Sequence, residues 1–172
     1  QIRAAMAGRP LDLPRKPGVR YRDALDLAGS GSDRTGYAIG HVEPGSHGPR
    51  AVVDVVRGWD ATVREETRFD TMAELRRGYG IETACEADQY ALSTANALAR
   101  ERGFSLVLAD ALVDGLSEVS VLFAEARISL PPLPRLKGQL PLVSVVAPAR
   151  GPWRAAVPPH PDGGHCDEAE AA

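Results

Sequence analysis

Three short segments of alternating apolar and polar residues follow one another with only tight turns between them. They span residues 21–27, 36–43 and 50–57, and the turns that join them are rich in Gly, Ser and Pro. Connections this short suit antiparallel neighbours, because parallel strands need a crossover of about a dozen residues or more. The sequence therefore predicts that the chain opens with an antiparallel meander of three strands.

Helices and strands alternate after the meander. The predicted segments lie at residues 66–79 (helix), 81–86 (strand), 89–102 (helix), 104–109 (strand) and from Asp114 onward (helix). Apolar residues recur at helical spacing in each predicted helix, and Gly80 and Gly103 stand where C-terminal caps belong. A strand–helix–strand order implies parallel pairing through right-handed crossovers.

This order of elements is that of the RNase H-like fold. We expect a mixed α/β domain with a five-stranded sheet, three strands antiparallel and two parallel, flanked by helices. Most of the 14 prolines lie after residue 130, so a proline-rich C-terminal extension is predicted there. Within it, residues 142–147 and 153–157 are expected to form a peripheral hairpin or edge strands. Residues 1–20 are predicted to be a linker or extended arm, and 21–172 the domain.

Composition limits the class of protein. With 172 residues and 44% apolar side chains, the chain suits one globular domain, and it has no apolar run long enough to span a membrane and no visible signal peptide. The net charge of −3 argues against tight autonomous binding to DNA phosphates. It does not exclude a nuclease, because a metal-binding active site is itself a cluster of carboxylates. Cys85 and Cys166 form no CxxC pair, Cys85 is predicted to be buried, and this usage fits a reducing cytoplasm.

Acidic residues stand at three places where this fold could bind divalent cations. Two-metal phosphodiester hydrolysis needs several carboxylates that converge on cations about 4 Å apart, and Mg²⁺ and Mn²⁺ prefer oxygen ligands. Asp26 closes the first strand, Asp88 follows the fourth strand, and Asp167 lies near the end of the chain. Because the ends of these two strands are neighbours in this topology, Asp26 and Asp88 are predicted to lie close together.

Each of these acids also has a purely structural interpretation. Asp26 precedes a turn of Gly and Ser, whereas Asp88 and Asp167 precede predicted helices, so turn capping or helix N-capping explains all three. Rival acids on the same segments are Glu86, Asp162 and Glu168.

Other chemistry-bearing residues give weaker signals. Asp33 is interpreted as a capping or supporting residue, and Asp54, which alternates with two valines, is predicted to face solvent. A zinc site is suggested by His160, His165 and Cys166, but a fourth ligand is missing. No GxSxG, HExxH, Walker A or GxGxxG motif appears.

Five stretches together resemble the C-terminal nuclease domain of tailed-phage large terminase subunits. In chain order they are YRDALDLAGSGSDRTGYAIG (21–40), VVDVVRGW (52–59), YGIETACEADQYA (79–91), residues 129–140, and PPHPDGGHCDEAEAA (158–172). Asp26, Asp88 and Asp167 fall on the acidic positions of that family, so the resemblance implies that they are the catalytic metal ligands for two ions, Mg²⁺ or Mn²⁺.

The resemblance also implies a biological setting. Such a domain would cut concatemeric viral double-stranded DNA during genome packaging, in the cytoplasm of the bacterial host. Its full-length parent would carry an ATPase domain before residues 1–20 and would work with a portal protein and a small terminase subunit.

One departure from the family pattern leaves alternatives open. The closing motif of the family has two adjacent Asp residues, and Cys166 replaces the first of them here. The alternatives are a catalytically silent docking or DNA-contact module of the packaging motor, and another RNase H-like nuclease such as a junction resolvase or transposase core.

Overall fold

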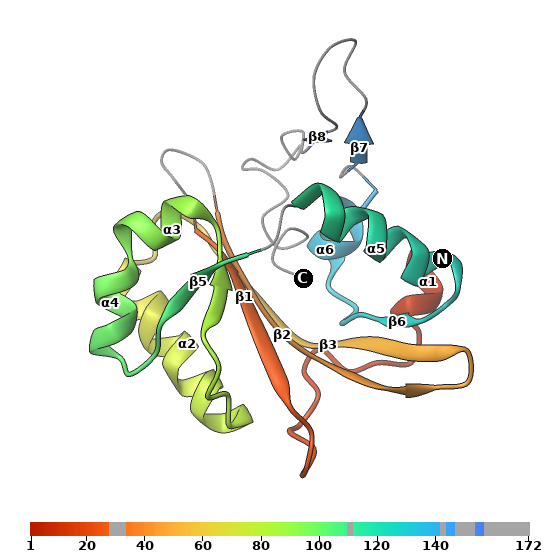
Figure 1. Ribbon diagram of the computed structural model, residues 1–172, viewed down its shortest axis with the longest axis horizontal. Coiled ribbons are helices and arrows are strands. Elements are labelled where there is room, and N and C mark those ends of the chain that lie inside the picture. The colour runs from red at the N-terminus through yellow and green to blue at the C-terminus, as the bar shows by residue number, and fades with distance from the viewer. Residues whose placement is uncertain (28–33, 110–111, 142–143, 147–153, 157–172) are drawn as a thin grey trace.

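A mixed sheet of six strands forms the centre of the computed structural model, which describes residues 1–27, 34–109, 112–141, 144–146 and 154–156 (Figure 1). The sheet has the spatial order β5-β4-β1-β2-β3-β6. Its strands are β1 (Tyr21–Asp26), β2 (Thr35–Gly45), β3 (Gly48–Trp59), β4 (Cys85–Ala87), β5 (Leu106–Leu108) and β6 (Ile128–Ser129).

The predicted pairing of the sheet is confirmed, with one strand added. β1 pairs antiparallel with β2, and β2 with β3, whereas β4 runs parallel to both β1 and β5. The sixth strand, β6, pairs parallel with β3 through only two residues and was not predicted. A two-residue strand is too short to show alternation, so the prediction of five strands fell one short.

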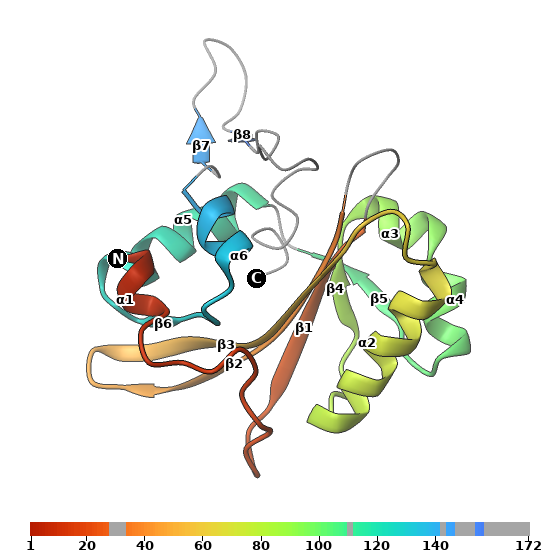
Figure 2. The same ribbon diagram turned by 180° about the vertical axis from the view of Figure 1, so that it is seen from behind.

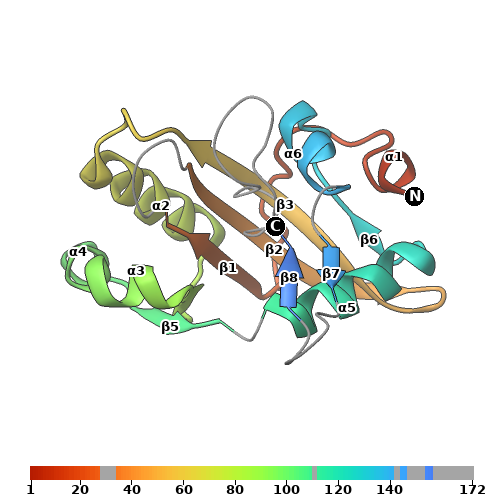
Figure 3. The same cartoon turned by 90° about the horizontal axis from the view of Figure 1, so that it is seen from above.

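Helices cover both faces of this sheet. One face carries α2 (Glu65–Tyr79), α3 (Gln89–Thr94) and α4 (Asn96–Glu101), and α1 (Ile2–Ala5), α5 (Leu112–Ala124) and α6 (Pro134–Gln139) gather over its β3 and β6 end (Figures 1 and 3). The single helix predicted over 89–102 is divided at Ala95, whose φ of −112° and ψ of 0° depart from the ideal α-helical values of about −63° and −42°. The predicted peripheral hairpin is present as β7 (Ser144–Val146) and β8 (Arg154–Ala156).

Two apolar clusters result, one on each face. Alternation along β2 separates them, because Tyr37 and Ile39 enter the cluster beneath α2 to α4, whereas Ala38 enters the cluster beneath α1 and α6. Cys85 is fully buried in the first cluster, as predicted, and burial raises the pKa of its thiol well above the usual value. No helix in the described part of the chain is long and apolar enough to cross a bilayer.

A β-bulge in the β2–β3 pair turns Asp54 into the protein. The register skips one residue of β3, since Ile39 pairs with Val55 and Gly40 pairs with Val53. Asp54 is therefore the extra residue, and it is 0% exposed. The prediction that Asp54 faces solvent was wrong, because simple alternation does not hold across a bulge. Gly40 permits the close approach of the two strands, since a Cβ there would lie 2.9 Å from the Val52 carbonyl oxygen.

Residues 1–20, predicted to be a linker or arm, lie along the sheet. The side chain of Met6 is buried in the second cluster, and the Leu13 N–H donates to the Asp54 carbonyl at 3.0 Å. Asp12 accepts two hydrogen bonds from the Arg57 guanidinium at 2.8 and 2.6 Å. This segment, here called the arm, is thus attached at several points; whether it follows an ATPase domain stays a prediction.

The C-terminal end of α2 offers a test of the local fold. Gly80 has φ 68° and ψ 41°, and its N–H and that of Ile81 close the helix on the Arg77 and Arg76 carbonyls. A side chain in this left-handed conformation costs about 1–2 kcal/mol, and a Cβ would also displace the Arg15 guanidinium. We expect Gly80→Ala to lower the free energy of unfolding by about 1 kcal/mol in urea titrations.

Gly78 provides the matched control for that substitution. It lies within α2 with open space around the position of a Cβ, so Gly78→Ala is expected to stabilise the protein by about 0.5–1 kcal/mol. Equal stability of the Gly80→Ala variant and the parent would show that the left-handed cap is unimportant.

Candidate functional site

Two of the predicted acids stand side by side where β1 and β4 end. Parallel pairing matches Ala24 with Glu86 and Leu25 with Ala87, so Asp26 and Asp88 are the next residues in register. Adjacent strands lie about 4.8 Å apart. The backbone of Asp88 is still extended, with φ −70° and ψ 170°, so alternation directs both acids to one face. The structure thus brings these two carboxylates to a common edge, and their role as ligands stays a prediction.

Asp88 also caps a helix, as its structural interpretation required. Its Oδ1 accepts a hydrogen bond from the Ala91 N–H at 2.7 Å at the start of α3. Burial raises the pKa of Asp88, and the cap bond offsets this only in part. A half-buried carboxylate of this kind gains more from a nearby cation than an exposed one does, because its charge is less well solvated.

Asp26 and the rival acid Glu86 differ in their surroundings. Asp26 is half-buried and pairs with Gly36 of β2 at the very end of β1. Glu86 lies two residues before Asp88 and forms an ion pair with Arg22, at 3.4 Å, between largely exposed side chains. Exposed pairs of this type contribute little to stability.

The third predicted ligand, Asp167, lies outside the described residues. So do Asp33 and the closing acids and zinc candidates, which are Asp162, Glu168, His160, His165 and Cys166. Within the residues that the structure describes, no group of three or more His, Cys, Asp or Glu side chains could hold a metal ion. The described part of the site therefore consists of two carboxylates, a donor type that suits Mg²⁺ and Mn²⁺.

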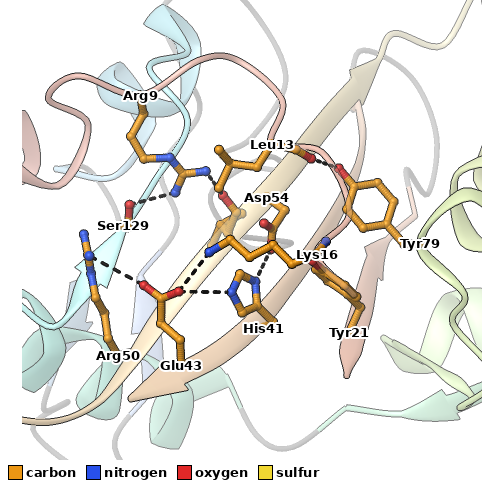
Figure 4. Close-up of polar contacts among 11 residues, drawn as sticks. Arg9, Leu13, Lys16, Tyr21, His41, Glu43, Arg50, Asp54, Tyr79 and Ser129 are labelled. Carbon is orange, nitrogen blue, oxygen red and sulfur yellow. Dashed lines mark hydrogen bonds and ion pairs between the residues drawn. The ribbon is translucent and has the colours of Figure 1, made fainter. Parts of the chain in front are cut away.

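A buried polar network lies further along β2, around His41 and the bulge of β3, and was not predicted (Figure 4). His41 Nδ1 lies 2.6 Å from Asp54 Oδ2, and both side chains are 0% exposed. His41 Nε2 is 3.5 Å from Glu43 Oε2, which also accepts a hydrogen bond from Lys16 Nζ at 3.0 Å. No sequence signal could have revealed this network, because the bulge that buries Asp54 leaves no mark in the apolar pattern.

The arm closes over this network. Arg9 donates to Ser129 Oγ at 2.7 Å and to the Val53 carbonyl at 2.8 Å (Figure 4). The bond from Lys16 is the main cause of the lowered pKa of Glu43, and burial raises the pKa of Asp54. A carboxylate and an imidazole enclosed in this way form a buried structural contact between β2 and β3 rather than an exposed reactive group.

Several solved structures of large terminases have the same fold as this chain. The large terminase nuclease of the thermophilic phage G20c superposes with a TM-score of 0.74 at 12% identity, over 99% of this chain and 92% of that one. The nuclease domain of the Thermus phage P74-26 large terminase gives 0.68 at 13% identity, over 96% and 84%. No family model and no curated protein sequence matches the chain.

A larger protein also contains this fold. The large terminase of another thermophilic bacteriophage gives a TM-score of 0.61 at 15% identity, over 90% of this chain but only 40% of that one. At such identities the likeness establishes architecture. The chain therefore has the fold of large-terminase nuclease domains, and the predicted RNase H-like fold class is confirmed.

Proposed function

We propose that this chain is the nuclease domain of a phage large terminase subunit, which cuts concatemeric viral double-stranded DNA during genome packaging. The observation that carries the proposal is the register of β1 and β4, which places Asp26 beside Asp88 in a fold shared with terminase nucleases. Fold alone does not define an activity. The proposal therefore depends on these two carboxylates standing together at one strand edge.

Divalent metal ions fit the donor set of this edge. Asp26 and Asp88 supply oxygen ligands, and Asp167 is proposed as the third, for two ions of Mg²⁺ or Mn²⁺. The G20c nuclease has been solved with bound magnesium and with bound cobalt. Bound cations of this type activate a water molecule and stabilise the leaving 3′ oxygen. The protein's own contribution is to fix the carboxylates, Asp26 through strand pairing and Asp88 through its cap bond.

The parent protein is proposed to be larger than this chain. The related large terminase is matched over only 40% of its length, as expected for one domain of a larger enzyme. An ATPase domain before the arm, a portal protein and a small terminase subunit would complete the packaging machinery, in the cytoplasm of the bacterial host.

A catalytically silent module is the second candidate function. The observations that favour it are Cys166, at a position where the family has Asp, and the net charge of −3, which disfavours tight binding to DNA. Such a module would retain the fold and dock within the motor without cutting DNA.

Cleavage of supercoiled plasmid separates the two candidates. We expect nicking and linearisation with Mn²⁺ or Mg²⁺, none with EDTA, and a loss of at least about 100-fold in Asp26→Asn, because an amide is a poor ligand for a hard cation. Asp70→Asn is the matched control, since Asp70 lies on α2 in a surface pair with Arg102 and its loss should leave cleavage unchanged.

Each other outcome has a definite meaning. Cleavage that survives Asp26→Asn would show that Asp26 is not a metal ligand. A folded protein that shows no cleavage with any of the metals would support the silent module, and recovery of cleavage in Cys166→Asp would then identify Cys166 as the reason.

A further inference from the structure

A buried ion pair lies on the α2 side of the strand that carries Asp26. Arg76 of α2 and Asp23 of β1 are each 4% exposed. Arg76 Nη1 donates to both oxygens of Asp23, and the Tyr37 hydroxyl donates to Asp23 Oδ2 at 2.7 Å. Charge-assisted bonds at a buried carboxylate are strong and geometrically demanding. The position of β1 on α2 is therefore tightly defined at this point.

The same guanidinium also holds the segment that leads into β4. Arg76 Nη2 donates to the Thr83 carbonyl, two residues before β4 begins at Cys85. Its Cζ lies 4.7 Å from the centre of the Phe104 ring, two residues before β5. One side chain thus contacts β1 and the segments that lead into the parallel strands β4 and β5, on the side of the sheet where α2 lies (Figure 2).

The pairing that this contact supports is short. Only two residue pairs define the register of β1 and β4, and β4 has three residues. A slip of one residue would displace Asp88 by about 3.3 Å along the strand and turn it to the opposite face. So short a ladder specifies register weakly on its own. The Arg76 guanidinium bonds both Asp23 on β1 and Thr83, which lies just before β4. These bonds help to fix the position of β4 relative to β1.

We propose that Arg76 is a positioning residue for the metal site, which sets the register of β1 against β4 so that Asp26 and Asp88 converge on the same cations. This inference rests on the proposed function, because it concerns the same pair of carboxylates. Arg76 lies on the α2 side of the sheet, where its partners are Asp23 and the Thr83 carbonyl rather than Asp26 or Asp88.

Two variants test the role of Arg76 through Mn²⁺ binding measured by titration calorimetry in the absence of DNA. Arg76→Lys keeps the charge beside Asp23 but lacks the planar fork that reaches both Asp23 and Thr83. The double variant Asp23→Leu/Arg76→Met removes the pair without leaving a buried charge, so it remains folded if the single variant does not. In both, Mn²⁺ affinity is expected to fall about 10- to 100-fold.

Asp54→Asn is the matched control. It disrupts the buried His41–Asp54 contact, which joins β2 to β3 and takes no part in the pairing of β1 with β4, and should lower the unfolding midpoint in urea while leaving Mn²⁺ affinity unchanged. Equal loss of affinity in this control would mean that binding follows overall stability, and the positioning role would be rejected.

Measurements on the unsubstituted chain and on Asp26→Asn distinguish failure of this inference from failure of the proposed function. If the unsubstituted chain binds no Mn²⁺, or Asp26→Asn binds it equally well, the proposed metal site is wrong and the inference is wrong with it. If the unsubstituted chain binds Mn²⁺ through Asp26 and both Arg76 variants bind Mn²⁺ as tightly as that chain does, only the positioning role is overturned.

Discussion

Replacing Asp88 with Asn is expected to abolish metal-dependent cleavage while changing the free energy of unfolding by less than about 0.5 kcal/mol. Asn caps helices as well as Asp does, and its amide oxygen can accept the bond that Ala91 N–H now gives to Asp88 Oδ1 at 2.7 Å. The charge is lost, however, and with it a ligand suited to a hard cation. Plasmid cleavage with Mn²⁺ should fall at least about 100-fold, and urea unfolding should be nearly unaltered.

Two further substitutions sharpen this test. Asp88→Ala removes the cap as well as the charge, so it should cost about 1 kcal/mol of stability in addition to activity. Glu86→Gln removes the neighbouring rival carboxylate, which forms an ion pair with the exposed Arg22, and should leave cleavage intact. Normal cleavage by Asp88→Asn would show that Asp88 serves only as a helix cap. If Glu86→Gln loses cleavage instead, Glu86 rather than Asp88 would be the metal ligand.

A second substitution, His41→Leu, should destabilise the protein by about 3–5 kcal/mol in urea titrations at neutral pH. It leaves the Asp54 carboxylate fully buried without the imidazole that now lies 2.6 Å away. Desolvation of an unpaired buried charge is far more costly than loss of an exposed contact. His47, which is exposed, provides the control, because His47→Leu should change stability by less than about 0.5 kcal/mol.

The pH dependence of the His41→Leu defect follows from Asp54. Burial raises the pKa of Asp54 in the folded state, so folding favours its neutral form. The defect should therefore be smallest below the ordinary pKa of 3.8 and grow as the pH rises through the raised folded value. The double variant His41→Leu/Asp54→Leu should recover most of the lost stability. A His41→Leu protein within about 1 kcal/mol of the parent would show that the buried pair is not important for folding.

Much of the architecture was predictable because it rests on local patterns. Alternating residues and Gly-rich turns identify β1 to β3, and helical spacing before Gly80 and Gly103 identifies the helices between the parallel strands. The proximity of Asp26 and Asp88 then follows from the order of the elements, since parallel β1 and β4 end at one edge.

The unpredicted features depend on contacts between distant residues. Asp54 is internal because one residue of β3 bulges opposite Ile39 and Gly40, and the apolar pattern contains no sign of it. Arg76 and Asp23 look like ordinary polar positions until α2 packs on β1. The proposed ligand Asp167 follows from resemblance alone, because it lies outside the described residues.

The arm occupies part of a sheet edge whose backbone groups would otherwise be unpaired. β6 covers β3 only at Ala51 and Val52, and the next two carbonyls, of Val53 and Asp54, accept hydrogen bonds from Arg9 and Leu13. Unsatisfied strand edges recruit other strands and promote aggregation. The arm therefore covers an edge of β3 that could otherwise pair with a strand of another molecule. A domain trimmed to begin at β1 would expose this edge and is expected to aggregate more readily.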